Sequence, residues 1–372
     1  MGVGKRSVEG LVTIGPAGWR GRSVLVTGHT GFKGGWLSLW LHQLGATVHG
    51  YALEPPTKPS LFEVARIGSI MASDTWADLA DLTRLRGTLK SAGPEVVFHM
   101  AAQPLVRESY RDPLATLGTN VIGTSHVLEA ARACESVRAV VVITSDKVYA
   151  DVGSGQPHRE GDALGGHDPY SASKAAAEIV TASYRDSFFS RRNDSPTRIA
   201  TARAGNVIGG GDWAAERLMP DCLRAFQNHS PVRLRYPNAL RPWQHVLEPL
   251  SGYMRLAEAL IGSKDDDLAN AWNFGPGASS DATVRELAEL TAKIWGNGAC
   301  VDDTGGMDSP HERGLLRLDS TRARDELGWR PRWSLRDALQ KTVAWHRAWM
   351  SGADMVAVTS EQIEAYEAAG SR

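Results

Sequence analysis

The chain has 372 residues, of which 42% are hydrophobic and 22% charged, and its formal net charge is −1. This length suits one large or two medium globular domains, and the near-neutral charge excludes the broad basic field that attracts nucleic acid. No apolar run reaches membrane-spanning length, and the first residues lack the apolar core of a signal peptide. We therefore expect a cytoplasmic protein with no nucleic-acid and no membrane partner.

The cysteines Cys134, Cys222 and Cys300 lie far apart in the chain and lack the spacing of metal ligands. Their odd number favours a reducing compartment over a disulfide framework. The sequence therefore predicts neither a disulfide nor a metal site.

The first ordered element is predicted at residues 23–27, after a loose N-terminal extension over residues 1–20. The run 23–27 is rich in β-branched residues and ends at Gly28, a pattern typical of a buried parallel strand. A helix is predicted around residues 36–41, followed by a second strand over residues 46–51. The chain thus begins with a strand, a glycine-containing turn, a helix and a strand.

Two further apolar runs, residues 95–98 and 139–143, each follow a helical segment. Strands that alternate with helices form right-handed βαβ units, in which the strands are parallel. The sequence therefore predicts an α/β fold of the Rossmann type, with a doubly wound parallel sheet.

The pattern changes at about residue 207, where arginine and proline become frequent and the alternation loosens. We assign residues 21–206 to a dinucleotide-binding Rossmann domain. Residues 207–350 are predicted to form mainly a smaller substrate-binding lobe, interleaved with the last strands of the first domain. Residues 351–372 are left as a C-terminal tail.

A glycine series, Gly28-x-x-Gly31-x-x-Gly34, lies between the first predicted strand and helix. This is the context of a dinucleotide fingerprint, in which glycines allow a tight turn and the pyrophosphate binds the helix N-terminus. No acidic residue ends the second strand, where Leu53 stands, so this rule leaves NAD and NADP open. Lys33 is either a phosphate contact or a solvated loop lysine.

Tyr170 and Lys174 are four residues apart, so on a helix they share one face. An ammonium at that position lowers the pKa of the phenol, which would make Tyr170 an acid or base near neutral pH. The run 144–147, Thr-Ser-Asp-Lys, follows the strand at 139–143 and precedes this pair. Asp146 and Lys147 are catalytic candidates, the alternative being an exposed ion pair in a loop.

The glycine spacing resembles that of the extended short-chain dehydrogenase/reductases. Several further motifs occur in the order found in the nucleotide-sugar 4,6-dehydratases of that family, and most closely in those that act on CDP-glucose. These motifs lie at residues 29–34, 99–103, 144–149, 203–213 and 241–246. The resemblance runs from about residue 19 to about residue 350. Departures from the family pattern are Ala77, where relatives often have glycine, and the segment 313–316.

The pair Asp146-Lys147 is the most distinctive feature of the resemblance. Enzymes that act on dTDP-glucose or GDP-mannose carry Asp-Glu at these positions, whereas those that act on CDP-glucose carry Asp-Lys. A 4-epimerase usually has small or neutral residues there. The alternatives left open are a 4,6-dehydratase or 4-epimerase for another nucleotide sugar, and a non-enzymatic NAD(P)-binding sensor.

The resemblance implies a lyase that converts CDP-glucose to its 4-dehydro-6-deoxy product with NAD. C4 is oxidised, water is lost from C5 and C6, and the hydrogen taken from C4 returns to C6. Tyr170 would be the base for the C4 hydroxyl, Lys174 would bind the nicotinamide ribose, and Ser145 would bind the C4 oxygen. Asp146 would protonate the leaving C6 hydroxyl. Lys147 would either remove the C5 proton or remain charged and stabilise the enolate.

The resemblance also implies contacts to the cofactor and to the sugar nucleotide. Asp78 is placed at the adenine, with a helix N-cap as the alternative. Asn206 and Arg241 are placed at the diphosphate, whose oxygens suit a guanidinium fork. The full cofactor set is Gly28, Thr30, Gly31, Phe32, Lys33, Gly34, Asp78, Leu79, Ala101, Ala102, Gln103, Asn120, Thr144, Tyr170, Lys174 and Ala204. The substrate set is Ser145, Asn206, Arg217, Leu234, Arg235 and Arg241, with Leu234, Arg235 and, more weakly, Arg217 at the base.

Relatives pair through the helix that carries the catalytic tyrosine and its neighbour. The resemblance therefore implies a homodimer or a dimer of dimers.

Overall fold

The computed structural model of the chain describes residues 16–370 except 152, 154, 191–194, 263–265 and 303–315. Most of the predicted N-terminal extension and residues 313–315 of the departing segment lie outside the described residues. Within them, no helix is long and apolar enough to cross a membrane.

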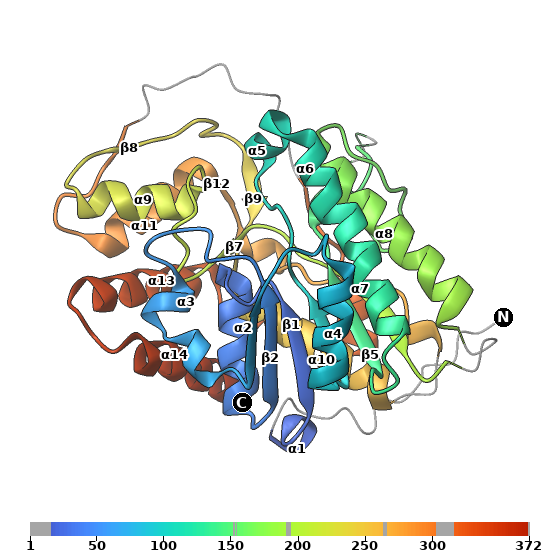
Figure 1. Cartoon of the computed structure of the whole chain (residues 1–372). Coiled ribbons are helices and arrows are strands. Elements are labelled where there is room, and N and C mark those ends of the chain that lie inside the picture. The colour runs from blue at the N-terminus through green and yellow to red at the C-terminus, as the bar shows by residue number, and fades with distance from the viewer. Residues whose placement is uncertain are drawn as a thin grey trace.

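A seven-stranded sheet forms the centre of the structure, in the order β11-β6-β5-β4-β1-β2-β3 (Figure 1). Every neighbouring pair in it is parallel. Because β1 lies between β2 and β4, the strand order reverses at β1, and such a switch point is where open α/β sheets bind ligands. The predicted doubly wound parallel sheet is confirmed. Its strands are β1 Ser23–Thr27, β2 Thr47–Ala52, β3 Ser73–Trp76, β4 Val96–His99, β5 Ala139–Ile143, β6 Arg198–Arg203 and β11 Ala271–Asn273.

Helices cover both faces of this sheet, and alternate strand residues point to opposite faces. In β1, for example, Val24 and Val26 pack on one face and Leu25 on the other. The helices on the Val24 face are α2 Phe32–Gln43 and α10 Leu247–Gly262, with α14 Met355–Ala369 packed against α2. Those on the Leu25 face are α4 Leu82–Ala92, α7 Gly123–Arg132 and α8 Pro169–Phe188.

A smaller lobe with its own apolar core lies beyond the ends of the strands (Figure 1). Its helices are α9 Leu218–Gln227, α11 Val284–Trp295 and the first half of α13 Leu335–Met350. Three short strand pairs complete it: β7 Val207–Ile208 with β10 Gln244–His245, β8 Val232–Arg233 with β13 Val301–Asp302, and β9 Leu240–Pro242 with β12 Asp281–Thr283. Between β10 and β12 the chain returns to the main sheet through α10 and β11, and β11 pairs with β6.

The remaining elements are short. They are α1 Pro16–Trp19, α3 Leu61–Val64, η1 Ile67–Ile70, α5 Val106–Arg111, α6 Pro113–Leu117, η2 Gly118–Ile122, η3 Asp146–Val148, η5 Asp266–Leu268, η6 Ala278–Ser280 and α12 Thr321–Glu326.

Ordered structure begins before the predicted start of the folded region and continues through the C-terminal segment. Residues 16–19 form α1, and the side chain of Trp19 is fully buried near Phe98. At the other end, the segment assigned to a tail forms α14, whose Tyr366 is also fully buried. Both aromatic side chains pack against residues far away in the chain, so local sequence patterns do not reveal them.

Tyr366 donates a hydrogen bond of 2.6 Å to Glu248, a buried carboxylate on α10. Glu248 also accepts bonds from the backbone N–H groups of Arg332 and Trp333. Burial raises the pKa of Glu248 to about 7. Because this pKa lies above the unfolded value, the carboxyl group contributes most to stability at low pH, and that contribution is lost as pH rises through about 7.

We predict that Tyr366→Phe lowers the free energy of unfolding more at pH 8 than at pH 5. At pH 8 the ionised carboxylate loses a charge-assisted bond worth about 1.5–3 kcal/mol, whereas at pH 5 a neutral bond worth about 1 kcal/mol is lost. Urea unfolding at both pH values measures the difference, with the exposed Tyr110→Phe as control. Equal losses at the two pH values would contradict the predicted ionisation of Glu248.

Candidate active site

One cavity of about 420 Å³ lies between the ends of the main-sheet strands and the smaller lobe. It brings together most of the residues predicted from the sequence. The predicted residues that line it are Phe32, Lys33, Ala102, Thr144, Ser145, Asp146, Lys147, Tyr170, Lys174, Ala204, Asn206, Arg217, Leu234, Arg235 and Arg241.

The glycine loop brings the start of α2 against the end of β1. Gly28 has a φ of +75°, and a Cβ there would lie 2.7 Å from the backbone nitrogen of Ala101. A Cβ on Gly34 would lie 2.1 Å from the carbonyl oxygen of Gly28. The N-cap residue of α2 is Gly31, and no side chain caps this end of the helix. The first N–H groups of α2 therefore remain available to an anion, as a dinucleotide pyrophosphate requires.

The predicted adenine contacts lie beyond the cavity, after β3. Asp78 is exposed, and its Oδ1 accepts a bond from the backbone N–H of Ala80 at 2.8 Å. The N-cap of α4 is Asp81 rather than Asp78, so the alternative explanation of Asp78 as a helix cap is excluded. Leu79 is buried against Gly123. Thr30, in the glycine loop, donates to the carbonyl oxygen of Leu53.

Asn120 connects the loop after β4 to α8. Its Oδ1 accepts from the backbone N–H of Gln103 at 2.8 Å, and its Nδ2 donates to Ser173 at 2.8 Å. Asn120 lies in η2, a single turn of π-helix, and is 1% exposed. Ala101, in the same loop, donates its N–H to Thr27 of β1. These bonds fix the backbone on one side of the cavity.

Helix α8 begins with an Asp168 capping box and Pro169, which place Tyr170 in the first turn. Lys174 lies one turn further along the helix, and its Nζ donates to the carbonyl oxygen of Ile143 at 3.0 Å. Burial lowers the pKa of Lys174 to about 8, opposed by the negative charge of Glu178.

The expected fall in the pKa of Tyr170 is not met in this structure. Burial raises that pKa to about 12, and the nearby charge of Asp146 adds to the rise. A hydrogen bond with Ser145 and the positive charge of Arg217 act in the opposite direction. Sequence spacing identified the lysine on the same helix face, but desolvation outweighs the influence of neighbouring charges here.

The segment after β5 is held by the neighbouring strand. The backbone N–H groups of Thr144 and Asp146 donate to Ala202 and Ala204 at 3.0 and 3.3 Å. Ser145 donates its hydroxyl to Asp146 Oδ1 at 3.0 Å. Asp146 is 4% exposed, and among the described residues no ion pair joins it to Lys147. Both residues line the cavity, so the alternative of an exposed loop ion pair is excluded.

Lys33 also points into the cavity rather than into solvent. Its Nζ donates to the hydroxyl of Tyr253 at 2.9 Å. Burial lowers the pKa of Lys33 to about 7, and the positive charges of Lys174 and Arg217 lower it further, whereas Asp146 opposes the change. Lys33 is therefore a member of the group of charges around Asp146.

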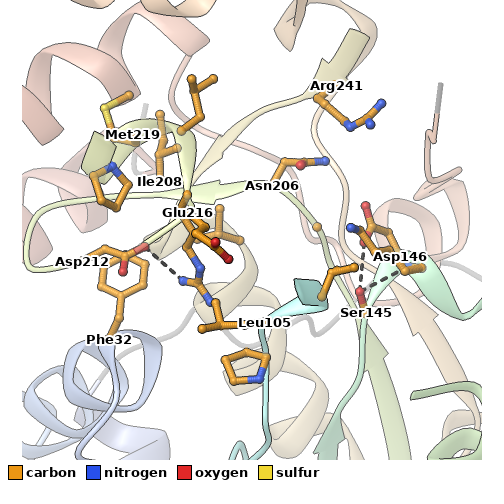
Figure 2. A pocket seen from close by; sticks show the side chains of 18 of the residues that line it. Phe32, Leu105, Ser145, Asp146, Asn206, Ile208, Asp212, Glu216, Met219 and Arg241 are labelled. Carbon is orange, nitrogen blue, oxygen red and sulfur yellow. Dashed lines mark hydrogen bonds and ion pairs between the residues drawn. The ribbon is translucent and has the colours of Figure 1, made fainter. Parts of the chain in front are cut away.

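The two predicted diphosphate residues lie on the side of the cavity that carries Ser145 and Asp146 (Figure 2). Asn206 has a left-handed backbone conformation, with a φ of +47°. Arg241 is 8% exposed and donates to the carbonyl oxygen of Leu240.

Arg217 and Arg235, both assigned to the nucleotide base, have different surroundings. Arg217 pairs with Asp212 at 3.0 Å, and its charge acts on Tyr170. Arg235 donates to Asp221 at 3.1 Å and to the carbonyl oxygen of Glu216 at 2.9 Å. The structure therefore places Arg217 near the acid–base residues and leaves Arg235 at the wall formed by α9.

Several charged residues that hold the site were not predicted from the sequence. Asp212 stands within a motif that was recognised, and Glu178 continues the spacing of Tyr170 and Lys174 by four more residues. Glu216 has a φ of +64° and pairs with Arg107 of α5 at 3.3 Å, a contact for which the sequence offers no local signal.

Three comparisons with known proteins agree with this geometry. A family model described as GDP-mannose 4,6 dehydratase matches residues 25–342. The chain is 47% identical over 358 residues to a CDP-glucose 4,6-dehydratase of Salmonella typhimurium, across 95% of this chain and 98% of the relative. It is 30% identical to a dTDP-glucose 4,6-dehydratase of Streptomyces griseus, across 72% and 77% of the two chains. The structure of MoeE5 in complex with UDP-glucose and NAD is similar, with a TM-score of 0.72, 27% identity and coverage of 88% and 99%.

We predict that Gly34→Ala weakens the binding of NAD by tenfold or more, about 1.4 kcal/mol. The added Cβ would meet the backbone of Gly28, so the loop that receives the pyrophosphate has to move. Titration calorimetry measures the change. The control is Gly87→Ala in α4, where an added Cβ meets no atom within 4 Å. Native NAD affinity in Gly34→Ala would contradict the role assigned to this loop.

Proposed function

Because the chain belongs to the GDP-mannose 4,6 dehydratase family, we propose that it is an NAD-dependent lyase that dehydrates CDP-glucose to CDP-4-dehydro-6-deoxy-glucose. The identity with the Salmonella typhimurium CDP-glucose 4,6-dehydratase supports the choice of nucleotide and sugar. The Asp-Lys pair at residues 146 and 147 supports it independently, because the enzymes for dTDP-glucose and GDP-mannose carry Asp-Glu there.

The observation that carries the proposal is the position of Asp146, buried next to Ser145 in the same cavity as Tyr170. A 4-epimerase needs a base and a dinucleotide but no group that protonates a leaving hydroxyl. A binding protein without activity needs neither acid nor base. In the cavity, the segment after β5 provides the acid Asp146 and the lysine Lys147, and helix α8 provides the base Tyr170. An elimination requires such a set of acid and base groups.

NAD fits the residues that this chain provides. The uncapped N-terminus of α2 and the close approach at Gly28 and Gly34 suit the pyrophosphate. Tyr170 and Lys174 line the cavity at the ends of β4 and β5, where the nicotinamide end of the cofactor is expected. When bound, NAD supplies the oxidation at C4 and the matching reduction at C6, so the overall reaction has no net redox change.

The protein residues then supply the proton transfers. Tyr170 accepts the proton of the C4 hydroxyl, which requires that the positive charge of bound NAD offset the burial that raises the pKa of this phenol. Ser145 holds the oxygen as it becomes a carbonyl. The C4 ketone acidifies the C5 hydrogen, since the resulting carbanion is delocalised as an enolate. Asp146 gives its proton to the C6 hydroxyl, which leaves as water. Lys147 either removes the C5 proton or remains charged and stabilises the enolate.

We also infer a homodimer or a dimer of dimers, formed through the face of α6, η2 and α8. Large apolar side chains are exposed on these elements: Leu114 is 80% exposed, Ile122 54% and Ile179 60%. Helices α6, α7 and α8 run side by side along one edge of the molecule (Figure 1). Light scattering of Ile179→Glu tests this assembly: the variant is expected to have half the oligomeric mass of the native protein, and an unchanged oligomeric mass would contradict it.

The three cysteines are free, and Cys300 is exposed. This supports a reducing compartment, and we propose the cytoplasm.

The direct test is to incubate the purified protein with NAD and CDP-glucose and to analyse the sugar nucleotide by mass spectrometry. We predict a product that is lighter by one water. No change of mass would point to a 4-epimerase or to a binding protein. Calorimetry with NAD and NADP gives the cofactor preference, and NADP binding tenfold tighter than NAD, about 1.4 kcal/mol, would contradict our proposal.

We predict different effects from the two arginines at the substrate. Arg241→Ala should weaken the binding of CDP-glucose and UDP-glucose alike, because both substrates present the same diphosphate. Arg235→Ala should reduce the preference for CDP-glucose over UDP-glucose, since a guanidinium can donate to cytosine O2 or N3. The measurement is kcat/KM for both substrates with each variant. Equal losses for the two substrates in Arg235→Ala would remove Arg235 from base selection.

A further inference from the structure

Gly205 lies on the segment after β6, directly beneath the carboxylate of Asp146. A Cβ built on Gly205 would lie 1.8 Å from Asp146 Oδ2, 2.1 Å from its Cγ and 2.6 Å from its Oδ1. The φ of Gly205 is outside the left-handed region. The lack of space, and not the backbone conformation, therefore requires glycine at this position.

The rest of Asp146 has little freedom to adjust. Its backbone N–H is bonded to Ala204, the neighbour of Gly205, and its Oδ1 accepts from Ser145. The carboxylate is almost fully buried. Because both the backbone and one oxygen are tied, a Cβ on Gly205 would displace the carboxylate away from β6 and into the cavity.

We propose that Gly205 is a positioning residue for the elimination step: its missing side chain allows the Asp146 carboxylate to lie on the β6 segment. The inference rests on the proposed function, in which Asp146 protonates the leaving C6 hydroxyl. Gly205 lines the same cavity, but the proposed role needs no contact between Gly205 and the substrate or cofactor. It acts only by leaving room for the carboxylate of Asp146.

The size of the effect follows from the contact distances. A contact of 1.8 Å has to lengthen beyond 3.0 Å, so the carboxylate moves by at least about one ångström. A misplacement of this size costs roughly 10²-fold in the rate of the step concerned. The C4 oxidation depends on Tyr170 and Ser145 and should change much less.

The kinetic test compares Gly205→Ala with Asp146→Asn in single turnovers of CDP-glucose, quenched with acid and analysed by mass spectrometry. Both variants should accumulate a sugar nucleotide lighter by two hydrogens, oxidised at C4 but not yet dehydrated. The double variant should eliminate water no more slowly than Asp146→Asn alone. The control is Gly87→Ala, which should behave like the native chain. A Gly205→Ala protein that dehydrates at the native rate, or that slows both steps equally, would overturn the proposal.

A stability cycle tests the same contact without any turnover. Gly205→Ala should lower the urea midpoint of the native chain, because the new methyl group is overpacked against the carboxylate. In an Asp146→Ala background it should leave the midpoint unchanged, since the atoms that it meets are gone. Equal loss in both backgrounds would show that Asp146 is not the obstructing group. The two proposals can fail separately. If the native chain fails to dehydrate CDP-glucose but Gly205→Ala lowers the urea midpoint only when Asp146 is present, the proposed function is wrong and the close approach of Gly205 to Asp146 is confirmed.

Discussion

A buried ion pair between Glu178 and Arg203 connects the three elements that carry the site. Glu178 is on α8, one turn beyond Lys174, and Arg203 ends β6, two residues before Gly205. The side chains are 4% and 3% exposed, and Nη2 of Arg203 lies 2.9 Å from Oε2 of Glu178. Glu178 also accepts from Thr144, at the end of β5. The pair thus fixes α8, β5 and β6 relative to one another. The removal of one partner would leave an uncompensated buried charge, at a cost of about 3–5 kcal/mol.

With α8, β5 and β6 held in this way, few additional contacts are needed to position the site residues. The bonds from β6 to Thr144 and Asp146 carry the β5 pairing beyond the strand and aim the acid into the cavity. Tyr170, in the first turn of α8, lines the same cavity as the segment after β5. Gly28 and Gly34 bring the start of α2 close to β1, so that a bound cofactor can reach Tyr170 and this segment. The smaller lobe then covers the cavity and contributes the arginines that an anionic substrate requires.

Local patterns in the sequence predicted much of this architecture. β1 and β5 have the predicted bounds, because a run of β-branched residues between turns has few other structures open to it. β2 and β4 each start one residue later than predicted, at Thr47 and Val96. Most of the predicted site residues line one cavity, since residues at the carboxyl ends of parallel strands meet at one edge of the sheet.

What the sequence did not reveal depends on contacts between distant segments. The burial of Trp19, the burial of Tyr366 and the bond from Tyr366 to Glu248 each depend on contacts between residues far apart in the chain. The high pKa of Tyr170 results from burial, which spacing along a helix cannot measure. Gly205 lies within the recognised motif at residues 203–213, but its role depends on where a second segment places a carboxylate.

In the proposed reaction, the hydrogen removed at C4 returns to C6 of the same sugar while water leaves. CDP-glucose with deuterium at C4, turned over by the native chain with NAD and analysed by NMR, tests it most directly. Our account predicts a 4-dehydro-6-deoxy product with deuterium in the C6 methyl group. A product without deuterium at C6, or a sugar that has only changed its configuration at C4, would contradict it.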